Sequence, residues 1–168
     1  NDIRLAASGP RCGLNELILP ANEPGSSIMP GKVNPTQCEQ VTQTAVQIGG
    51  NDAAISFASG QGQFELCTFF PVTAYNFLQS VRLLSQSMDS FRIRLLDGLE
   101  VNVEQMRKNL HRSLMLSTLL SPTIGYEKAA HIARLAYQNE WTLKEAALQS
   151  GYLSEAEIDA LLNPEQAV

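Results

Sequence analysis

The side chains best suited to chemistry lie together in the stretch Gly25-Ser26-Ser27-Ile28-Met29-Pro30-Gly31-Lys32-Val33-Asn34-Pro35. It carries two hydroxyls, one ammonium and one amide, and Lys32 is the only lysine before residue 108. Lys32 and Asn34 are two residues apart, so they would face one side of an extended segment ahead of a proline. Asn34 would also open a helix, whose N-terminus favours anions. The stretch is therefore predicted to hold a small carboxylate or phosphate. The alternative is a surface loop with a solvated lysine.

A long loop and a helix must position these residues. The loop is predicted for residues 10–35, because five of the 8 prolines fall there: Pro10, Pro20, Pro24, Pro30 and Pro35. A helix is predicted to begin at Asn34-Pro35, with Asn34 as the N-cap. Its apolar stripe consists of Cys38, Val41, Ala45 and Ile48. Gly49-Gly50 is expected to break or kink this helix, and residues 53–70 to form a short helix and a loop.

Two further regions complete the predicted fold. Residues 71–97 form the strongest helical pattern, and they are apolar on several faces, which predicts burial in an oligomer or against further chain. Residues 99–168 predict short helices with capping boxes at Thr142 and Ser154 and a helix-ending glycine at Gly151. No strand pattern is present. The predicted fold is all-α, with part of a long-helix bundle in residues 1–98 and a small helical C-terminal domain in residues 99–168.

Composition excludes several classes of protein. Of the 168 residues, 44% are hydrophobic and 17% charged, which favours a folded core over a disordered chain. The net charge of −5 argues against general attraction to nucleic acid. Cys12, Cys38 and Cys67 lack zinc-site spacing and are typical of reduced thiols in the cytosol. The uncharged run 66–81 is too short for a membrane span, for which about 20 residues are needed. We expect no metal and no cofactor. The chain opens inside a helical pattern without Met, so we expect a fragment.

The loop and several distant segments resemble one family. The run from Asn22 to Glu39 resembles the signature loop of the fumarase/aspartase superfamily, and in particular that of class II fumarate hydratases. Further segments share the likeness: residues 1–4, 8–13, 76–84, 124–126 and 151–157. Pro24, Gly31 and the run 36–39 favour fumarase over aspartase. The likeness covers the whole chain but only the C-terminal part of the family's length.

The resemblance implies roles for six residues. Ser26 resembles the catalytic base that removes the carbon-bound proton of malate, and Glu39 the glutamate that supports a catalytic histidine from another segment. The expected substrate-binding residues are Ser27, Lys32, Val33 and Asn34. The resemblance also implies a small dicarboxylate substrate, fumarate or malate, a place in the tricarboxylic acid cycle, a cytoplasmic homotetramer, and no nucleic-acid or membrane partner. The fragment alone is expected to be inactive.

Other interpretations remain open at this point. Aspartase or another lyase of the superfamily shares the same loop. Residues 142–158 resemble a helix-turn-helix, but Glu155 and Glu157 would repel phosphates. A structural or oligomerisation fragment without activity of its own is a third interpretation. Neither His111 nor His131 matches the family's catalytic histidine, and both are predicted to be structural or surface residues.

Overall fold

The computed structural model describes residues 1–164, and these form two compact units that divide between Asn102 and Val103. The predicted all-α class is confirmed: helices dominate both units, and only two short strands accompany them. Among the described residues no helix is both long enough and apolar enough to cross a lipid bilayer. Each unit is described separately below.

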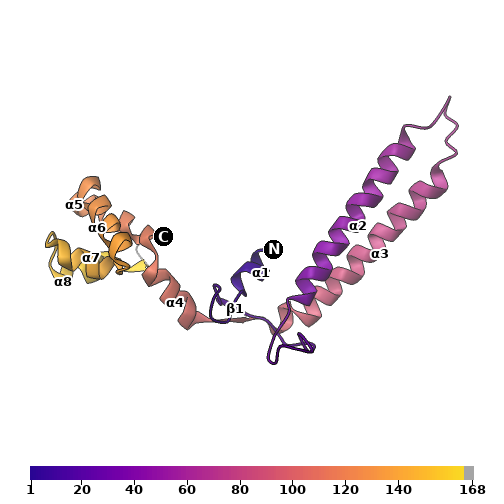
Figure 1. Ribbon diagram of the computed structural model, residues 1–168. Coiled ribbons are helices and arrows are strands. Elements are labelled where there is room, and N and C mark those ends of the chain that lie inside the picture. Colours follow the sequence, from indigo (N-terminus) through magenta and orange to yellow (C-terminus); the bar gives the residue numbers. More distant parts are fainter. Residues whose placement is uncertain (165–168) are drawn as a thin grey trace. The chain divides into compact units, whose positions relative to one another are not determined.

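The first unit is built on a helical hairpin. Its long helices are α2 (Thr36–Ser59) and α3 (Phe70–Arg94), which lie side by side in Figure 1 and are joined at their far end by a loop. A short helix, α1 (Asp2–Ala6), precedes the hairpin, and a 3-10 turn, η1 (Leu96–Gly98), follows it. The helices of 24 and 25 residues each span about 36–38 Å at about 1.5 Å per residue.

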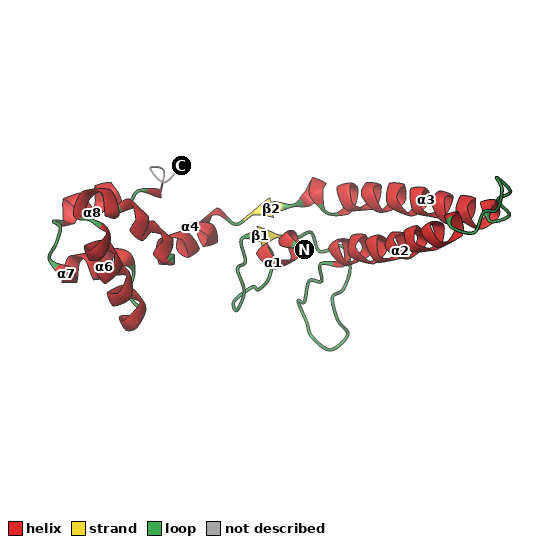
Figure 2. Ribbon diagram, turned by 90° about the horizontal axis from the view of Figure 1, so that it is seen from above, coloured by secondary structure: helices red, strands yellow, loops and turns green. Residues whose placement is uncertain are grey.

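A two-stranded ribbon closes the base of this unit, so the expectation that no strand is present was wrong. Strands β1 (Leu17–Ile18) and β2 (Glu100–Val101) pair antiparallel, as Figure 2 shows. The main-chain N–H of Asn102 extends the ladder by donating to Glu16 O at 2.9 Å. Segments of two residues are too short to display an alternating pattern, which is why sequence analysis missed them.

Helix α2 departs from prediction at its start and in its middle. Pro35 occupies the N-cap position, and no side chain caps the helix, so the prediction of Asn34 as N-cap was wrong. The helix also continues through Gly49-Gly50, where a break or kink was expected. Two neighbouring glycines weaken a helix locally. Here the side-chain amide of the next residue, Asn51, is hydrogen-bonded to α3, and that contact holds the helical path.

The seam between α2 and α3 is unusually polar. Asn51 is 3% exposed, and the two hydrogens of its Nδ2 are shared among three acceptors: Gln79 Oε1 at 2.9 Å, Ser80 Oγ at 3.0 Å and Asn76 O at 3.3 Å. Its Oδ1 accepts from Gln47 Nε2 at 2.9 Å. Buried amides require such partners, because an unpaired polar group is costly away from water. Around Asn51 the helices therefore pack through polar side chains, while Val41 and Ile48 of α2 share an apolar hollow with Phe91 of α3.

The second unit begins with α4 (Val103–Arg112) and then folds around an apolar core. Its other elements are η2 (Leu114–Leu119), α5 (Ser121–Ile124), α6 (Tyr126–Asn139), α7 (Leu143–Ser150) and α8 (Glu155–Leu161). The fully buried side chains at its centre are Leu120, Ile132 and Ile158. Alanines Ala129, Ala136, Ala146 and Ala147 let the helices approach closely.

Local capping signals define the helix ends of this unit, as predicted. The Thr142 hydroxyl oxygen accepts a hydrogen bond from the Glu145 N–H, and the Glu145 carboxylate accepts one from the Thr142 N–H at 2.7 Å. Ser154 and Glu157 repeat the same capping box at the start of α8. Gly151 ends α7 in the left-handed region with φ of +67°, where glycine carries no steric penalty.

The core of the second unit yields a stability prediction. Replacing Ile132 by Ala should lower the free energy of unfolding by about 2–5 kcal/mol, because it removes a fully buried side chain and leaves a cavity. Urea titration followed by the fluorescence of Trp141, the single tryptophan, reports on this unit. Tyr137→Ala on the same helix is the control, since that side chain is 76% exposed. Equal effects of the two substitutions would contradict the assigned core.

The capping boxes yield a prediction on pH. Hydrogen bonds from Thr142 lower the pKa of Glu145, and those from Ser154 lower the pKa of Glu157. The native state then binds fewer protons than the unfolded state, so the stabilisation is complete above the ordinary carboxyl pKa and is lost as pH falls through the lowered pKa.

The test compares urea titrations of the protein and of the Glu145→Gln/Glu157→Gln variant, again by Trp141 fluorescence. As the pH falls from about 6 to about 3, through the range in which carboxyl groups titrate, the free energy of unfolding should decrease less in the variant than in the unsubstituted protein. Glu140→Gln serves as the control, because Glu140 lies outside both boxes. Identical pH profiles for all three proteins would refute the contribution of the boxes.

Candidate active site

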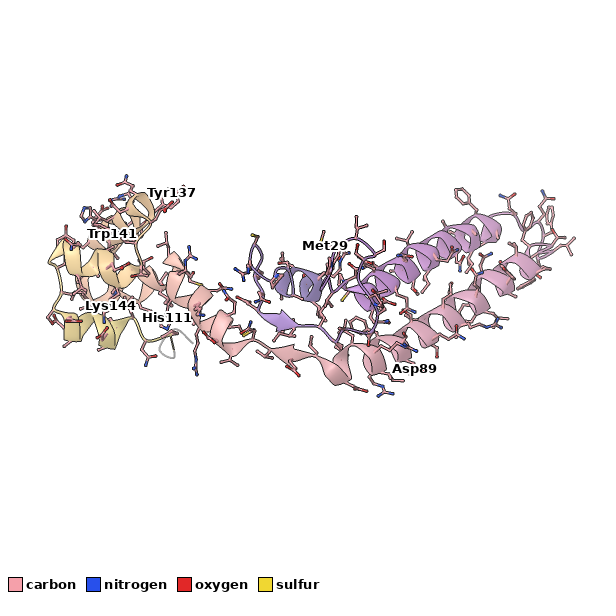
Figure 3. All side chains as sticks on the ribbon, turned by 60° about the horizontal axis from the view of Figure 1, so that its bottom comes forward. Met29, Asp89, His111, Tyr137, Trp141 and Lys144 are labelled. Atoms are coloured by element: carbon pink, nitrogen blue, oxygen red, sulfur yellow. The ribbon has the colours of Figure 1, made fainter. Side chains whose placement is uncertain are left out.

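The predicted site loop lies between β1 and α2 and is tied down at two points. Asn22 Nδ2 donates to Arg94 O at 2.6 Å, which fixes the start of the loop to the end of α3. Asn34 Nδ2 donates to Gly25 O, also at 2.6 Å, and joins the two ends of the segment 25–34. Met29, labelled in Figure 3, lies within this segment.

The two serines differ in their surroundings. Ser26 is half-buried, and its Oγ accepts the main-chain N–H of Ile28 at 3.2 Å. Ser27 is exposed. A donor directed at Oγ favours negative charge there. Of the two hydroxyls, Ser26 is therefore the one whose environment suits an alkoxide.

Lys32 lies on the returning side of the loop. Its N–H donates to Met29 O at 3.3 Å, and Gly31 turns the chain with φ of +76°. The side chain is exposed, and among residues 1–164 no carboxylate forms an ion pair with its ammonium. The ammonium is thus available to an anion.

Three of the six predicted site residues share one hollow. Ser26, Lys32 and Val33 line a cavity of about 580 Å³ whose walls come entirely from residues 21–33. Glu23 is the one carboxylate on its wall and Lys32 the one ammonium. Ser27, Asn34 and Glu39 do not line it. The cavity has room for a small molecule, with a hydroxyl and a cation on its wall.

Glu39 lies in the first turn of α2, where the positive end of the helix dipole favours a carboxylate. Its Oε1 lies 4.0 Å from Arg4 Nη2 of α1. Both side chains are about two-fifths exposed, so water screens the pair and its contribution to stability is small. No spacing rule connects residues this far apart in the chain, so the contact between Arg4 and Glu39 has no signal in the sequence.

The cysteine beside Glu39 is not a nucleophile. Cys38 is 4% exposed, and this burial raises the pKa of its thiol, which therefore stays protonated at neutral pH. Cys38 is thus a thiol of the core. Cys67 is half-buried and Cys12 exposed, and all three cysteines are free.

Both histidines lie in the second unit, apart from the loop in sequence. His131 on α6 contacts Tyr152, with Nδ1 3.4 Å from the hydroxyl and the rings 5.8 Å apart. His111 on α4 lines a cavity of about 530 Å³ together with Lys144, and both are labelled in Figure 3.

The helix-turn-helix interpretation concerned α7 and α8. Lys144 is the only cation after Arg134, and its ammonium lies 2.6 Å from Asp159 and 3.7 Å from Glu155. The hydrogen bond that Lys144 donates to Asp159, together with the negative charges of Asp159 and Glu155, raises the pKa of Lys144. Acidic side chains surround the one positive charge, so this face has no cation to offer a phosphate.

Comparisons with known proteins bear on both units. Residues 1–50 match the lyase family model, and residues 116–167 match the model of the fumarase C C-terminus. The first match contains the loop with Ser26 and Lys32. The second contains the core of the second unit.

Similar proteins extend the match to nearly the whole chain. The class II fumarate hydratase of Oceanobacillus iheyensis is 59% identical over 166 residues, which are 99% of this chain and 36% of that protein. The enzyme of that name from Listeria monocytogenes is 57% identical over 164 residues, 98% of this chain and 36% of its own. A crystal structure of class II fumarase from Schistosoma mansoni superposes with a TM-score of 0.90 at 43% identity, covering 98% of this chain and 34% of that one.

The chain therefore spans about a third of the length of the relatives it matches. The similarity covers both units, and it includes residues 116–167, which match the model of the fumarase C C-terminus. The resemblance inferred from the loop is confirmed: this chain is, in sequence and in fold, a counterpart of the C-terminal part of the class II fumarate hydratases.

Proposed function

We propose that this chain is part of a fumarate hydratase, which reversibly hydrates fumarate to (S)-malate. The observation that carries the proposal is the loop of residues 21–33, where the Ser26 hydroxyl and the Lys32 ammonium line one cavity. Relatives that are 57–59% identical and named class II fumarate hydratase support the choice of reaction over that of aspartases.

The proposed chemistry begins at Ser26. In the direction from malate, Ser26 Oγ as alkoxide takes the proton from the carbon next to a carboxylate. The electron pair of that C–H bond moves into the carboxylate and forms an aci-carboxylate with two negative charges. The Ile28 N–H, 3.2 Å from Oγ, favours the alkoxide before the reaction. The electron pair then forms the C=C bond while the C–O bond breaks and the hydroxyl leaves as water.

Lys32 is the proposed stabiliser of the aci-carboxylate. Preorganised donors act strongly where charge develops, and losing one typically costs about 2.7–4 kcal/mol of activation free energy. Ser27, Val33 and Asn34 are proposed to contact substrate, and Glu39 to support a histidine from another part of the enzyme. The proton that the leaving hydroxyl needs would come from a group outside this chain.

The proposed assembly is a homotetramer. On α3 four large apolar side chains form a stripe that is 49–62% exposed: Phe77, Val81, Leu84 and Met88. The contact with α2 includes the polar side chains of Asn51 and Ser80. Leu84 and Met88 also line a hollow that they share with apolar side chains of α2, and they are still about half exposed. Monomers rarely leave so much contiguous apolar surface in water. A cytoplasmic location and a place in the tricarboxylic acid cycle, both expected from the sequence, stay predictions.

The catalytic prediction concerns the full-length enzyme. Ser26→Ala should lower kcat for hydration by about 10²–10⁴-fold, the usual contribution of a general base. Lys32→Met should lower kcat/KM by about 10²–10³-fold, because it removes a charged donor. Both are measured by following the ultraviolet absorbance of fumarate.

The isolated 168-residue chain should not turn over fumarate in the same assay, because the group proposed to take the proton of the attacking water lies in another part of the enzyme. Gln86→Glu on the exposed polar face of α3 is a control that should keep wild-type kcat. An unimpaired Ser26→Ala enzyme would remove Ser26 from the role of base. Robust turnover by the isolated chain would show that it holds every catalytic group.

The assembly prediction concerns the stripe on α3. Leu84→Glu should weaken association of the full-length protein at least about 10-fold per contact, because a buried leucine contributes about 1.5–3 kcal/mol. Sedimentation velocity measures the effect. Gln86→Glu adds the same charge beside Arg82 and Asp89, and it should sediment as the wild type. A wild-type protein that sediments as a monomer would refute the tetramer.

A further inference from the structure

The loop that carries Ser26 and Lys32 has a closed neck. At this neck the Asn34 amide donates to Gly25 O at 2.6 Å, and Asn34 is half-buried. The main chain crosses itself at the same place. A Cβ added to Gly25 would overlap the carbonyl group of Lys32. Glycine at position 25 is therefore required by the close approach of the two sides of the loop.

The neck is adjacent to both chemical groups. Ser26 follows Gly25 directly, and Lys32 precedes Asn34 by two residues. Ser26 thus lies on one side of the neck and Lys32 on the other, and the Asn34 amide joins these two sides. Without that bond Ser26 and Lys32 are connected through the five residues between them, within which Ile28 N–H donates to Ser26 Oγ at 3.2 Å and Lys32 N–H donates to Met29 O at 3.3 Å. Misplacing reacting groups by about 1 Å can cost about 10²-fold in rate.

The Asn34 side chain does not cap the helix that follows it. Helix α2 starts after Pro35 and receives no side-chain cap. An N-cap asparagine would accept a main-chain N–H through its Oδ1. The observed bond instead uses Nδ2 as a donor to a carbonyl. This donor role distinguishes asparagine from aspartate, which caps a helix equally well but cannot donate when ionised.

We propose that Asn34 is a positioning residue whose amide clamps the loop neck through Gly25 O and so holds Ser26 and Lys32 in register before substrate binds. This role rests on the proposed function and adds to the substrate contact expected from the family resemblance. The clamp uses one of the two amide hydrogens, so the remaining polar atoms can still meet a ligand.

The test measures loop opening in the full-length protein without substrate. Hydrogen exchange of segment 25–34 and tryptic cleavage after Lys32 both report on opening. Asn34→Asp should raise both rates about 2–10-fold, the range expected for one net hydrogen bond. Gly25→Ala should do the same, although it adds only a methyl group and removes no ligand contact. Asn139→Ala is the matched control, since it deletes another amide-to-carbonyl bond, of 2.9 Å, on α6.

Kinetics of the same variants supply the second readout. Both neck substitutions should lower kcat more than they raise KM, and Gly25→Ala/Asn34→Ala should lose little more than either single variant, because both act through one neck. Unchanged exchange and cleavage in Asn34→Asp would overturn the clamp and leave Asn34 a ligand contact only. A wild-type enzyme without hydratase activity would instead overturn the proposed function, while the exchange rates would still decide whether the clamp exists.

Discussion

The buried amide of Asn51 sets the geometry on which the first unit depends. Its donors meet two side chains and one carbonyl of α3, and its acceptor is used by Gln47. A shift of α3 by one turn would leave these buried groups unpaired, at a cost of several hydrogen bonds. The polar seam thereby selects one register. In that register the end of α3 lies beside the loop that precedes α2, where Asn22 can reach Arg94 O.

The same seam explains why the hairpin is apolar on the outside. Small and polar side chains fill part of the contact between the helices, and many of the large apolar side chains of α3 remain exposed in this unit. The second unit follows the opposite rule. Its leucines, isoleucines and alanines are buried among its own helices, and polar groups remain at the helix ends. One unit thus has a core of its own, whereas the other has the surface expected of an element that packs against further chain.

The candidate site combines a sparse set of charges with a tightly folded loop. Lys32 is exposed and lacks a carboxylate partner among the described residues, so its charge is available to a ligand. Main-chain geometry supplies the rest: the Ile28 N–H meets Ser26 Oγ, and the Asn34 amide meets Gly25 O. Chemistry by such a loop depends on its shape, because neither hydroxyl nor ammonium is held by a rigid helix or strand.

Sequence alone determined the features that depend on neighbouring residues. The capping boxes at Thr142 and Ser154 and the glycine stop at Gly151 follow from local spacing, and the structure confirms them. The loop was equally visible from its prolines and glycines, and its residue pattern was enough for the family resemblance. The six site residues named from that resemblance stay predictions.

Only the tertiary structure decided the points where a distant group competes with a local preference. Asn34 has the side chain of a helix cap, but its amide goes to Gly25 O. Gly49-Gly50 should interrupt a helix, but the contacts of Asn51 with α3 keep α2 continuous. The strands β1 and β2 exist because each has the other as partner. In each case the deciding hydrogen bond joins residues that are far apart in the sequence or that lie at opposite ends of one loop. Such a bond leaves no periodic pattern in the sequence.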